Sequence, residues 1–173
     1  MDTGLLLQAL DLAAAKHRDQ RRKDTPKSPY INHPIAVAKM LWDCGVRDQT
    51  TILAAVLHDT IEDTDTTREE IVGLFGAEVA DVVVEVTDDK SLPKARRKEL
   101  QVEHAPHMSH AAKLVKLADK TCNVRDVIDS PPDWPFERKQ QYLAWAKQVV
   151  DGLRDASPSL AGRFDAQHAR GVR

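Results

Sequence analysis

Apolar residues recur at every third or fourth position in segment after segment of this chain. This spacing places apolar side chains on one face of an α-helix, whereas a half-buried β-strand requires strict alternation. The run Val82–Val84 is β-branched, as strands often are, but apolar residues at positions 79, 82, 83 and 86 follow the helical period. The sequence therefore predicts an all-α fold with no convincing strand.

The predicted helices have recognisable ends. Four short polar residues are suited to the N-cap position, where a side-chain oxygen accepts a hydrogen bond from an unpaired amide of the first turn: Asp48, Thr67, Ser109 and Ser157. Prolines stand where first turns begin and two glycines stand where helices end: Pro34, Pro93, Pro135, Pro158, Gly45 and Gly76. Together these segments predict a bundle of about eight or more helices. One helix is expected to continue from Ile52 into His58 and Asp59.

One domain is expected to span residues 1–173. A domain of about 150 residues buries roughly 70% of the surface that its unfolded chain exposes, so a core of this size needs no disulfide. Cys44 and Cys122 are far apart and lack Cys-x-x-Cys spacing, so we expect reduced thiols rather than a disulfide or a structural zinc site.

The charge balance limits the classes of partner. Lys and Arg number 25 against 27 Asp and Glu, a net charge of −2, so the basic excess typical of a DNA-binding domain is missing. No apolar run approaches the ~18 residues that a membrane span requires. Residues 1–10 carry neither a basic segment nor a small-residue cleavage site, as a signal peptide would. We therefore expect a soluble, cytoplasmic protein that binds neither DNA nor a membrane.

The segment from His58 to Asp63 contains the most informative polar residues. Glu62 follows His58 by four positions, and Asp63 follows Asp59 by four, so a helix would place these side chains side by side. Charged groups are costly to bury unless they are paired or coordinated, and a divalent cation would compensate several of them together. A solvated acidic helix end is the alternative interpretation, and the segment taken alone favours it.

Two further residues could complete a metal site. His33 lies at the start of a predicted helix, and Asp119 follows an apolar helical run with Asn123 four positions later. Two imidazoles and two carboxylates, from His33, His58, Asp59 and Asp119, suit manganese, iron or zinc better than copper or calcium.

Five motifs in this chain resemble, in the same order, those of HD-domain phosphohydrolases, and among them the hydrolase domain of the SpoT/Rel alarmone enzymes. The motifs are Arg22-Lys23-Asp24, Pro29-Tyr-Ile-Asn-His33-Pro34, Leu57-His-Asp-Thr-Ile-Glu-Asp-Thr-Asp65, Val115-Lys-Leu-Ala-Asp119-Lys120 and Asn123-Val-Arg125. The chain is most similar to the stand-alone small alarmone hydrolases of the metazoan SpoT-homologue type, over about residues 5–150.

The resemblance implies a function and a set of site residues. It implies manganese-dependent hydrolysis of guanosine 3′,5′-bis(diphosphate) (ppGpp), or of its pentaphosphate relative, at the 3′ position, which releases pyrophosphate and leaves GDP or GTP. Zinc and iron are the alternative metals. The implied metal ligands are His33, His58, Asp59 and Asp119, and the implied catalytic pair is Glu62 and Asp63. The implied substrate-binding residues are Arg22, Lys23, Asn123, Arg125, Lys94, Arg138 and Tyr142.

Some residues depart from the family pattern. Thr121 and Cys122 replace a larger pair, and Asp126 stands where longer members often carry threonine, which leaves pocket shape and base selectivity open. His104, His107 and His110 recur at every third position, but Pro106 interrupts the helix that a metal site would need, so we expect solvated loop histidines.

Two alternative functions remain at this level. The same site could act on another nucleotide with a 2′- or 3′-phosphate beside a purine, such as NADPH. A non-catalytic module that binds the alarmone and a partner protein is the second alternative, although Glu62 and Asp63 argue against it. The sequence does not determine the number of subunits.

Overall fold

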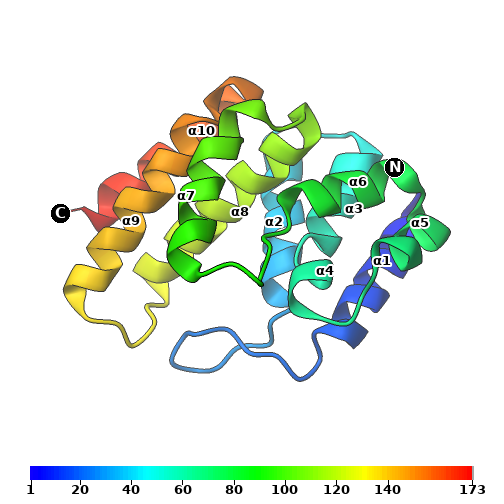
Figure 1. Cartoon of the computed structure of the whole chain (residues 1–173), viewed down its shortest axis with the longest axis horizontal. Coiled ribbons are helices and arrows are strands. Elements are labelled where there is room, and N and C mark those ends of the chain that lie inside the picture. Colours follow the sequence, from blue (N-terminus) through cyan, green and yellow to red (C-terminus); the bar gives the residue numbers. More distant parts are fainter. Residues whose placement is uncertain (173) are drawn as a thin grey trace.

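The computed structural model describes residues 1–172, which are largely helical. Ten α-helices and two 3₁₀ helices follow one another (Figure 1): α1 Thr3–Lys16, α2 Asn32–Asp43, α3 Gln49–Leu57, α4 Thr60–Asp63, α5 Arg68–Phe75, α6 Ala77–Val86, α7 Lys94–His104, η1 Ala105–His107, α8 His110–Asp129, α9 Phe136–Asp151, η2 Arg154–Ala156 and α10 Pro158–Gly171. Within residues 1–172, extended pairing is limited to isolated bridges, Arg21 with Pro29 and Asp24 with Pro132. The predicted all-α fold is confirmed.

The predicted helix ends form as local hydrogen bonds. The four N-cap side chains accept from amides three positions later: Asp48 from Thr51 at 2.8 Å, Thr67 from Glu70 at 3.2 Å, Ser109 from Ala112 at 3.3 Å and Ser157 from Leu160 at 3.2 Å. Gly45 and Gly76 follow α2 and α5 with φ of 90°, a conformation that a Cβ atom disfavours. The helix boundaries are therefore largely encoded by short-range interactions.

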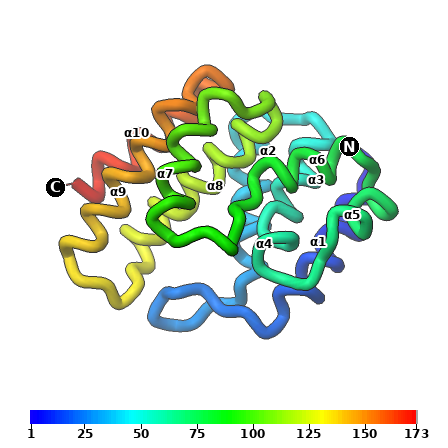
Figure 2. The backbone as a smooth tube through the Cα atoms, viewed as in Figure 1, coloured from blue at the N-terminus to red at the C-terminus, as the bar shows by residue number. Residues whose placement is uncertain are grey.

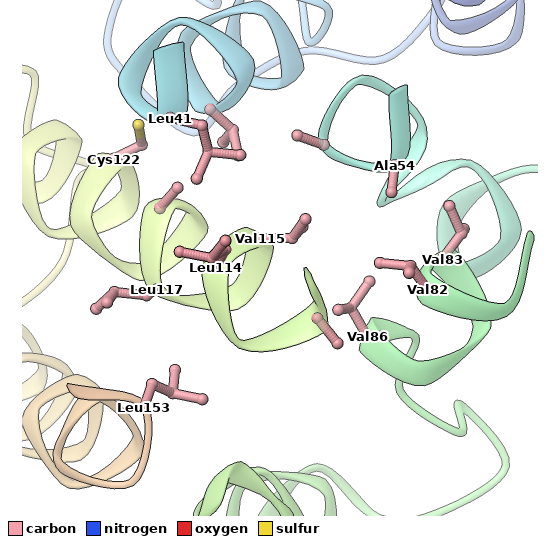
Figure 3. Close-up of a cluster of buried hydrophobic side chains, with 14 of the residues drawn as sticks. Leu41, Ala54, Val82, Val83, Val86, Leu114, Val115, Leu117, Cys122 and Leu153 are labelled. Carbon is pink, nitrogen blue, oxygen red and sulfur yellow. The ribbon is translucent and has the colours of Figure 1, made fainter. Parts of the chain in front are cut away.

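Helix α8 lies at the centre of the bundle. It contacts α2, α3, α6 and α10, and all of its residues from Ala112 to Cys122 are buried. Figure 3 shows Val115 among apolar side chains from the surrounding helices, including Leu41 of α2, Ala54 of α3 and Val83 of α6. Because α8 is enclosed on several sides, its polar residues are carried into the interior of the protein.

The helix predicted to continue through His58 and Asp59 is interrupted there, so this prediction was wrong. α3 ends at Leu57 and α4 begins at Thr60. The Thr60 hydroxyl donates to the Leu57 carbonyl at 2.7 Å, and His58 Nδ1 lies 2.8 Å from the Ala55 carbonyl. These side chains satisfy carbonyls that the next helical turn would otherwise use. The resulting turn separates the short α4 from α3 (Figure 1).

Two loops lie along the same side of the bundle (Figure 2). The first joins α1 to α2, and the second joins α8 to α9. Asp24 of the first loop and Pro132 of the second form an antiparallel bridge, and the Arg22 amide donates to the Ser28 carbonyl at 2.8 Å within the first loop. The two loops are therefore held against each other, although more than 100 residues of the chain separate Asp24 from Pro132.

The helices carry charged residues throughout. Even α8, which has 20 residues, contains Lys113, Lys116 and Lys120 in its buried half. No helix within residues 1–172 has the combination of length and apolar character that crossing a bilayer requires.

Candidate functional site

The structure brings the four predicted metal ligands together from three parts of the chain. His33 lies in the first turn of α2, His58 and Asp59 form the turn between α3 and α4, and Asp119 lies in the middle of α8. The ligand atoms of His33, His58 and Asp119 all lie within 4.8 Å of one another. His33 and Asp119 are 86 residues apart in the sequence, so only the packing of α2 against α8 can place them in one site.

The nitrogen and oxygen atoms are spaced as ligands of one cation would be. His33 Nε2 lies 3.0 Å from Asp119 Oδ1, and His58 Nε2 lies 3.0 Å from Asp59 Oδ2. The crossed distances are 3.9 Å from His33 Nε2 to Asp59 Oδ2 and 3.8 Å from His58 Nε2 to Asp119 Oδ1. Two ligands of one ion at about 2.0–2.2 Å lie roughly 3 to 4 Å apart, so the donor set fits a divalent cation.

The hydrogen bonding of His58 supports the same conclusion. Because Nδ1 faces the Ala55 carbonyl at 2.8 Å, the proton is assigned to Nδ1 and the lone pair of the neutral ring is on Nε2. Nε2 is buried and makes no well-formed hydrogen bond. This buried nitrogen faces the His33 nitrogen and the Asp59 and Asp119 oxygens without a well-formed hydrogen bond, so it can coordinate a cation once the cation displaces its proton.

The charges of the cluster are strongly coupled. Burial would lower the pKa of His58, but the Asp59 carboxylate, with Asp119 behind it, raises the pKa to about 9. Burial lowers the pKa of His33 despite its contact with Asp119. Burial would raise the pKa of Asp59, but the imidazoles hold it below its usual range, and Lys120 at 3.1 Å does the same for Asp119. The carboxylates therefore stay ionised and available to a cation.

The predicted catalytic pair lies beside this cluster. Glu62 and Asp63 end α4, and both line a cavity of about 160 Å³ whose walls also include His33, His58 and Asp119. Glu62 Oε2 accepts a hydrogen bond from the Asp88 amide at 3.0 Å. Burial raises the pKa of Glu62, as do the neighbouring carboxylates. A carboxylate of raised basicity thus lies next to the predicted metal ligands.

Tyr30 is a site residue that sequence reasoning missed. Its hydroxyl lies 2.7 Å from Asp59 Oδ2 and 3.3 Å from Asp63 Oδ2, so it connects a predicted metal ligand to the predicted catalytic pair. Burial, followed by the charge of Asp59, raises the pKa of the phenol far above its usual value, so the hydroxyl acts as a hydrogen-bond donor. Its place inside the Pro29–Pro34 motif was the only available signal.

A larger cavity of about 700 Å³ adjoins the small one. Tyr30, His33, Asp63 and Asn123 line both cavities. Among the predicted substrate-binding residues, the larger cavity is lined by Arg22, Lys23, Asn123, Arg125 and Tyr142. Its remaining walls come mostly from the two loops joined by the Asp24–Pro132 bridge, including Trp134.

Arg22 is held in a defined orientation on one wall of this larger cavity. Its guanidinium donates to Asp126 at 2.8 Å and to Asn123 Oδ1 at 3.0 Å, and lies 5.6 Å from the centre of the Tyr30 ring. Asn123 in turn donates to Asp119 Oδ1 at 2.5 Å. Arg22, Asn123 and Asp119 therefore form one chain of hydrogen bonds between the two cavities.

The three departures from the family pattern differ in their position. Asp126 lines the larger cavity and pairs with Arg125 at 2.9 Å as well as with Arg22. Thr121 and Cys122 are buried in α8 and line neither cavity, and the Thr121 hydroxyl donates to the Leu117 carbonyl. Of these three residues, only Asp126 can contact a ligand in the larger cavity.

Lys94 and Arg138 line neither cavity but lie close to Lys23. Burial lowers the pKa of the Lys23 ammonium, and the charges of Lys94 and Arg138 lower it further. Lys98 belongs to the same cluster, because Lys94, Lys120 and Arg138 lower its pKa after burial, and it stacks over Trp145 at 4.5 Å. Sequence reasoning missed Lys98. Several mutually repelling cations in a chain of net charge −2 indicate a region that binds an anion.

His104, His107 and His110 do not form a metal site. Within residues 1–172, the one group of three or more potential metal-binding side chains is His33, His58 and Asp119. His104 ends α7, His107 lies in η1 and His110 begins α8.

Comparison with known proteins agrees with this geometry. The model of the HD domain matches residues 9–148. The chain belongs to the HD-domain family. Within residues 9–148 of this HD domain lie all four residues of the donor set and both carboxylates of the pair.

Two relatives and one solved structure resemble this HD domain over nearly its whole length. Relatives named guanosine-3′,5′-bis(diphosphate) 3′-pyrophosphohydrolase MESH1 are 54% identical in Xenopus tropicalis, over 95% of this chain and 93% of the relative, and 56% identical in Homo sapiens, over 90% and 88%. A structure described as a metazoan ortholog of SpoT that hydrolyzes ppGpp superimposes with a TM-score of 0.94 at 45% identity, covering 98% of this chain and 97% of the other.

Proposed function

We propose that this HD domain hydrolyses guanosine 3′,5′-bis(diphosphate), and its pentaphosphate relative, at the 3′ position, releasing pyrophosphate and leaving GDP or GTP. One observation carries the proposal: two imidazoles and two carboxylates line one small cavity together with the predicted catalytic carboxylates, and this cavity adjoins one of about 700 Å³ that is bordered by cations. The MESH1 relatives, of 54% and 56% identity, are named for 3′-pyrophosphohydrolase activity on guanosine 3′,5′-bis(diphosphate).

Manganese is the metal we assign to the donor set, with zinc and iron as alternatives. His33, His58, Asp59 and Asp119 would hold it, since imidazole and carboxylate donors suit these ions. When bound, such an ion polarises phosphoryl oxygens and lowers the pKa of a water ligand, which makes the water a nucleophile at neutral pH.

The chain's own residues account for the remaining requirements. Glu62 has a raised pKa and lines the small cavity, so its ionised form is suited to accept a proton from the attacking water. Asp63 lines both cavities and is suited to orient that water toward a phosphate that enters from the larger one. The Tyr30 hydroxyl contacts both Asp59 and Asp63 and so fixes the position of one carboxylate relative to the other.

The larger cavity would hold the nucleoside and the phosphates that do not react. The Arg22 guanidinium is planar and fixed by Asn123 and Asp126, so it can stack on a purine. Lys23 and Tyr142 line the same space, and Lys94 and Arg138 add positive charge beside it. We assign the reaction to the cytoplasm, where free thiols such as those of Cys44 and Cys122 stay reduced.

A substrate panel tests the proposal. Purified protein with manganese should release pyrophosphate from the 3′-diphosphate, and chelation should abolish the release. Glu62→Gln should lower kcat by about 100-fold or more, as the loss of a general base does. Glu69→Gln, an exposed residue of α5, is the matched control.

Three results would overturn the assignment. Equal or higher kcat/KM for NADPH would identify a phosphatase for 2′-phosphorylated dinucleotides. Tight alarmone binding without turnover, unaffected by Glu62→Gln, would identify a non-catalytic binding module. Activity that survives both chelation and His58→Ala would refute the metal-dependent mechanism.

A further inference from the structure

The loop that joins α6 to α7, residues 87–93, contacts both members of the catalytic pair. The Asp88 amide donates to Glu62 Oε2 at 3.0 Å, and the Lys90 ammonium forms an ion pair with Asp63 Oδ1. These are the two carboxylates that line the small cavity from α4. One short segment therefore contacts the two groups whose orientation the proposed hydrolysis depends on.

This loop is itself anchored to the helices on either side of the cavity. The Asp88 carboxylate accepts from Gln101 of α7 at 2.6 Å, and its other oxygen lies 3.9 Å from the Lys116 ammonium of α8. Lys116 also donates to the Val86 carbonyl at 2.8 Å, which fixes the last residue of α6, directly before the loop. A buried ammonium shared by these two acceptors ties the loop to α8, three residues before Asp119.

The middle of the loop forms a turn that presents Lys90. Asp89 Oδ1 accepts from the Ser91 amide at 2.9 Å and from the Ser91 hydroxyl at 2.6 Å, and the Leu92 amide donates to the Asp89 carbonyl at 3.1 Å. A side-chain turn of this kind restricts the backbone around its central residue. Lys90 is that residue, so its backbone is constrained while its side chain reaches Asp63.

Lys90 approaches Asp63 from outside the site. It lines neither the cavity of about 160 Å³ nor the one of about 700 Å³, whereas Asp63 lines both. One oxygen of Asp63 faces Lys90 and the other faces the Tyr30 hydroxyl. The Lys90 side chain is 49% exposed, and an ion pair this exposed adds little to folding stability. Its effect is therefore expected on the orientation of Asp63 rather than on folding.

We propose that Lys90 is a positioning residue for Asp63, and that the 87–93 loop holds Glu62 and Asp63 as one unit against α7 and α8. The loop fixes Asp63 Oδ1 through Lys90 and Glu62 Oε2 through the Asp88 amide. The orientation of each carboxylate group, and so the position of its other oxygen, is thereby set. The inference rests on the proposed hydrolysis, since it assigns Lys90 a role in that reaction.

Kinetics of matched lysine variants provide the first test. Lys90→Met keeps the apolar stem and removes the charge. It should lower kcat about tenfold, because a misplaced Asp63 carboxylate slows the chemical step, while KM changes by less than about twofold. Lys90→Arg should retain kcat within about threefold of the unmodified protein, because it restores the charge. Lys147→Met is the control, since Lys147 is also 49% exposed and pairs with a carboxylate, Asp151, and neither residue lines either cavity.

A double variant separates positioning from direct action. If Lys90 acts only through Asp63, then Asp63→Asn and the combined Asp63→Asn, Lys90→Met protein should have the same kcat. Independent, additive losses would overturn the proposal. So would a Lys90→Met protein whose KM rises while kcat is unchanged, because that pattern would show that Lys90 binds the substrate itself.

Amide hydrogen exchange gives a readout that needs no turnover. In Lys90→Met the amides of residues 88–91 should exchange several-fold faster, and in Lys147→Met they should not change. Unchanged exchange in Lys90→Met would overturn the positioning role even if the protein hydrolyses the alarmone. Faster exchange in a protein that hydrolyses no nucleotide would instead retain the loop contact and refute the proposed function.

Discussion

The two adjoining cavities are built in different ways. The walls of the small cavity come mainly from helices and their ends, and its donors lie on α2, α8 and the turn after α3. The larger cavity is walled mainly by the loop between α1 and α2, the loop between α8 and α9, and one end of α8. His33, His58 and Asp119 are buried, whereas Arg22 is only partly buried and Lys23 is exposed.

This difference matches the proposed division of roles, in which the small cavity holds the metal and the catalytic groups and the larger cavity binds the nucleotide. Metal donors must hold their spacing to within a few tenths of an ångström, and packed helices provide that rigidity. A nucleotide with several phosphates and a base needs contacts that adapt, and loops on a rigid scaffold provide them. The four predictions below test whether the small cavity controls kcat and metal binding while the larger cavity controls KM.

The largest effect is expected in the small cavity. His58→Ala should lower kcat/KM by roughly 1000-fold, because it would remove one of the four proposed ligands of the cation that the proposed hydrolysis requires. It should also abolish the rise in melting temperature that manganese causes by binding the folded state. A variant that keeps the manganese-induced rise in melting temperature would show that His58 is not a ligand.

Metal affinity should depend on pH. The Asp59 carboxylate raises the pKa of His58 to about 9 against the effect of burial, so the metal-free imidazole is protonated at neutral pH. Manganese must displace that proton, and affinity should therefore fall about tenfold for each pH unit below 9. Calorimetry in buffers of different ionisation enthalpy would detect about one proton released per ion at pH 7. Affinity independent of pH between 6 and 8 would contradict this prediction.

A change in the larger cavity should act mainly on binding. Arg22→Ala removes the guanidinium that Asn123 and Asp126 orient, and should raise KM about tenfold with kcat reduced less than threefold. Steady-state kinetics with saturating manganese measures both values. If kcat fell as strongly as kcat/KM, Arg22 would act in the transition state, and the division between the cavities would fail.

The smallest effect is expected for Asp126→Thr, which introduces the residue that many longer family members carry. It leaves Arg22 and Arg125 without their carboxylate partner, and should raise KM about threefold while manganese affinity stays the same. Comparing guanine with adenine nucleotides would show whether Asp126 also affects base selectivity. A lower manganese affinity would show that the Arg22–Asn123–Asp119 chain couples the two cavities.

Local sequence signals located most of the helices correctly. Asp48, Thr67, Ser109 and Ser157 each cap a helix through a bond to an amide three residues away, so their effect is readable in a short stretch of sequence. The helix break after Leu57 was not predicted. There, side-chain hydrogen bonds from Thr60 and His58 to backbone carbonyls compete with an otherwise helical sequence pattern.

The candidate site was accessible to sequence reasoning only in part. The resemblance identified His33, His58, Asp59 and Asp119, and the structure brings them to one place. Tyr30, Lys98 and the proposed positioning residue Lys90 were missed, since a lone tyrosine or lysine carries no spacing signal and its partner lies tens of residues away. Asp126 was noted as a departure from the family, but nothing in the sequence indicated that it pairs with Arg22, 104 residues earlier.

The sequence by itself determined the helical class, most helix ends and the residue types of the donor set, because those properties depend on periodicity and on hydrogen bonds between near neighbours. Only the tertiary structure decided that α8 carries Asp119 into contact with His33, that two distant loops enclose one cavity, and that the 87–93 loop contacts Glu62 and Asp63. These contacts depend on how buried faces pack against one another, and that packing is a property of the whole chain.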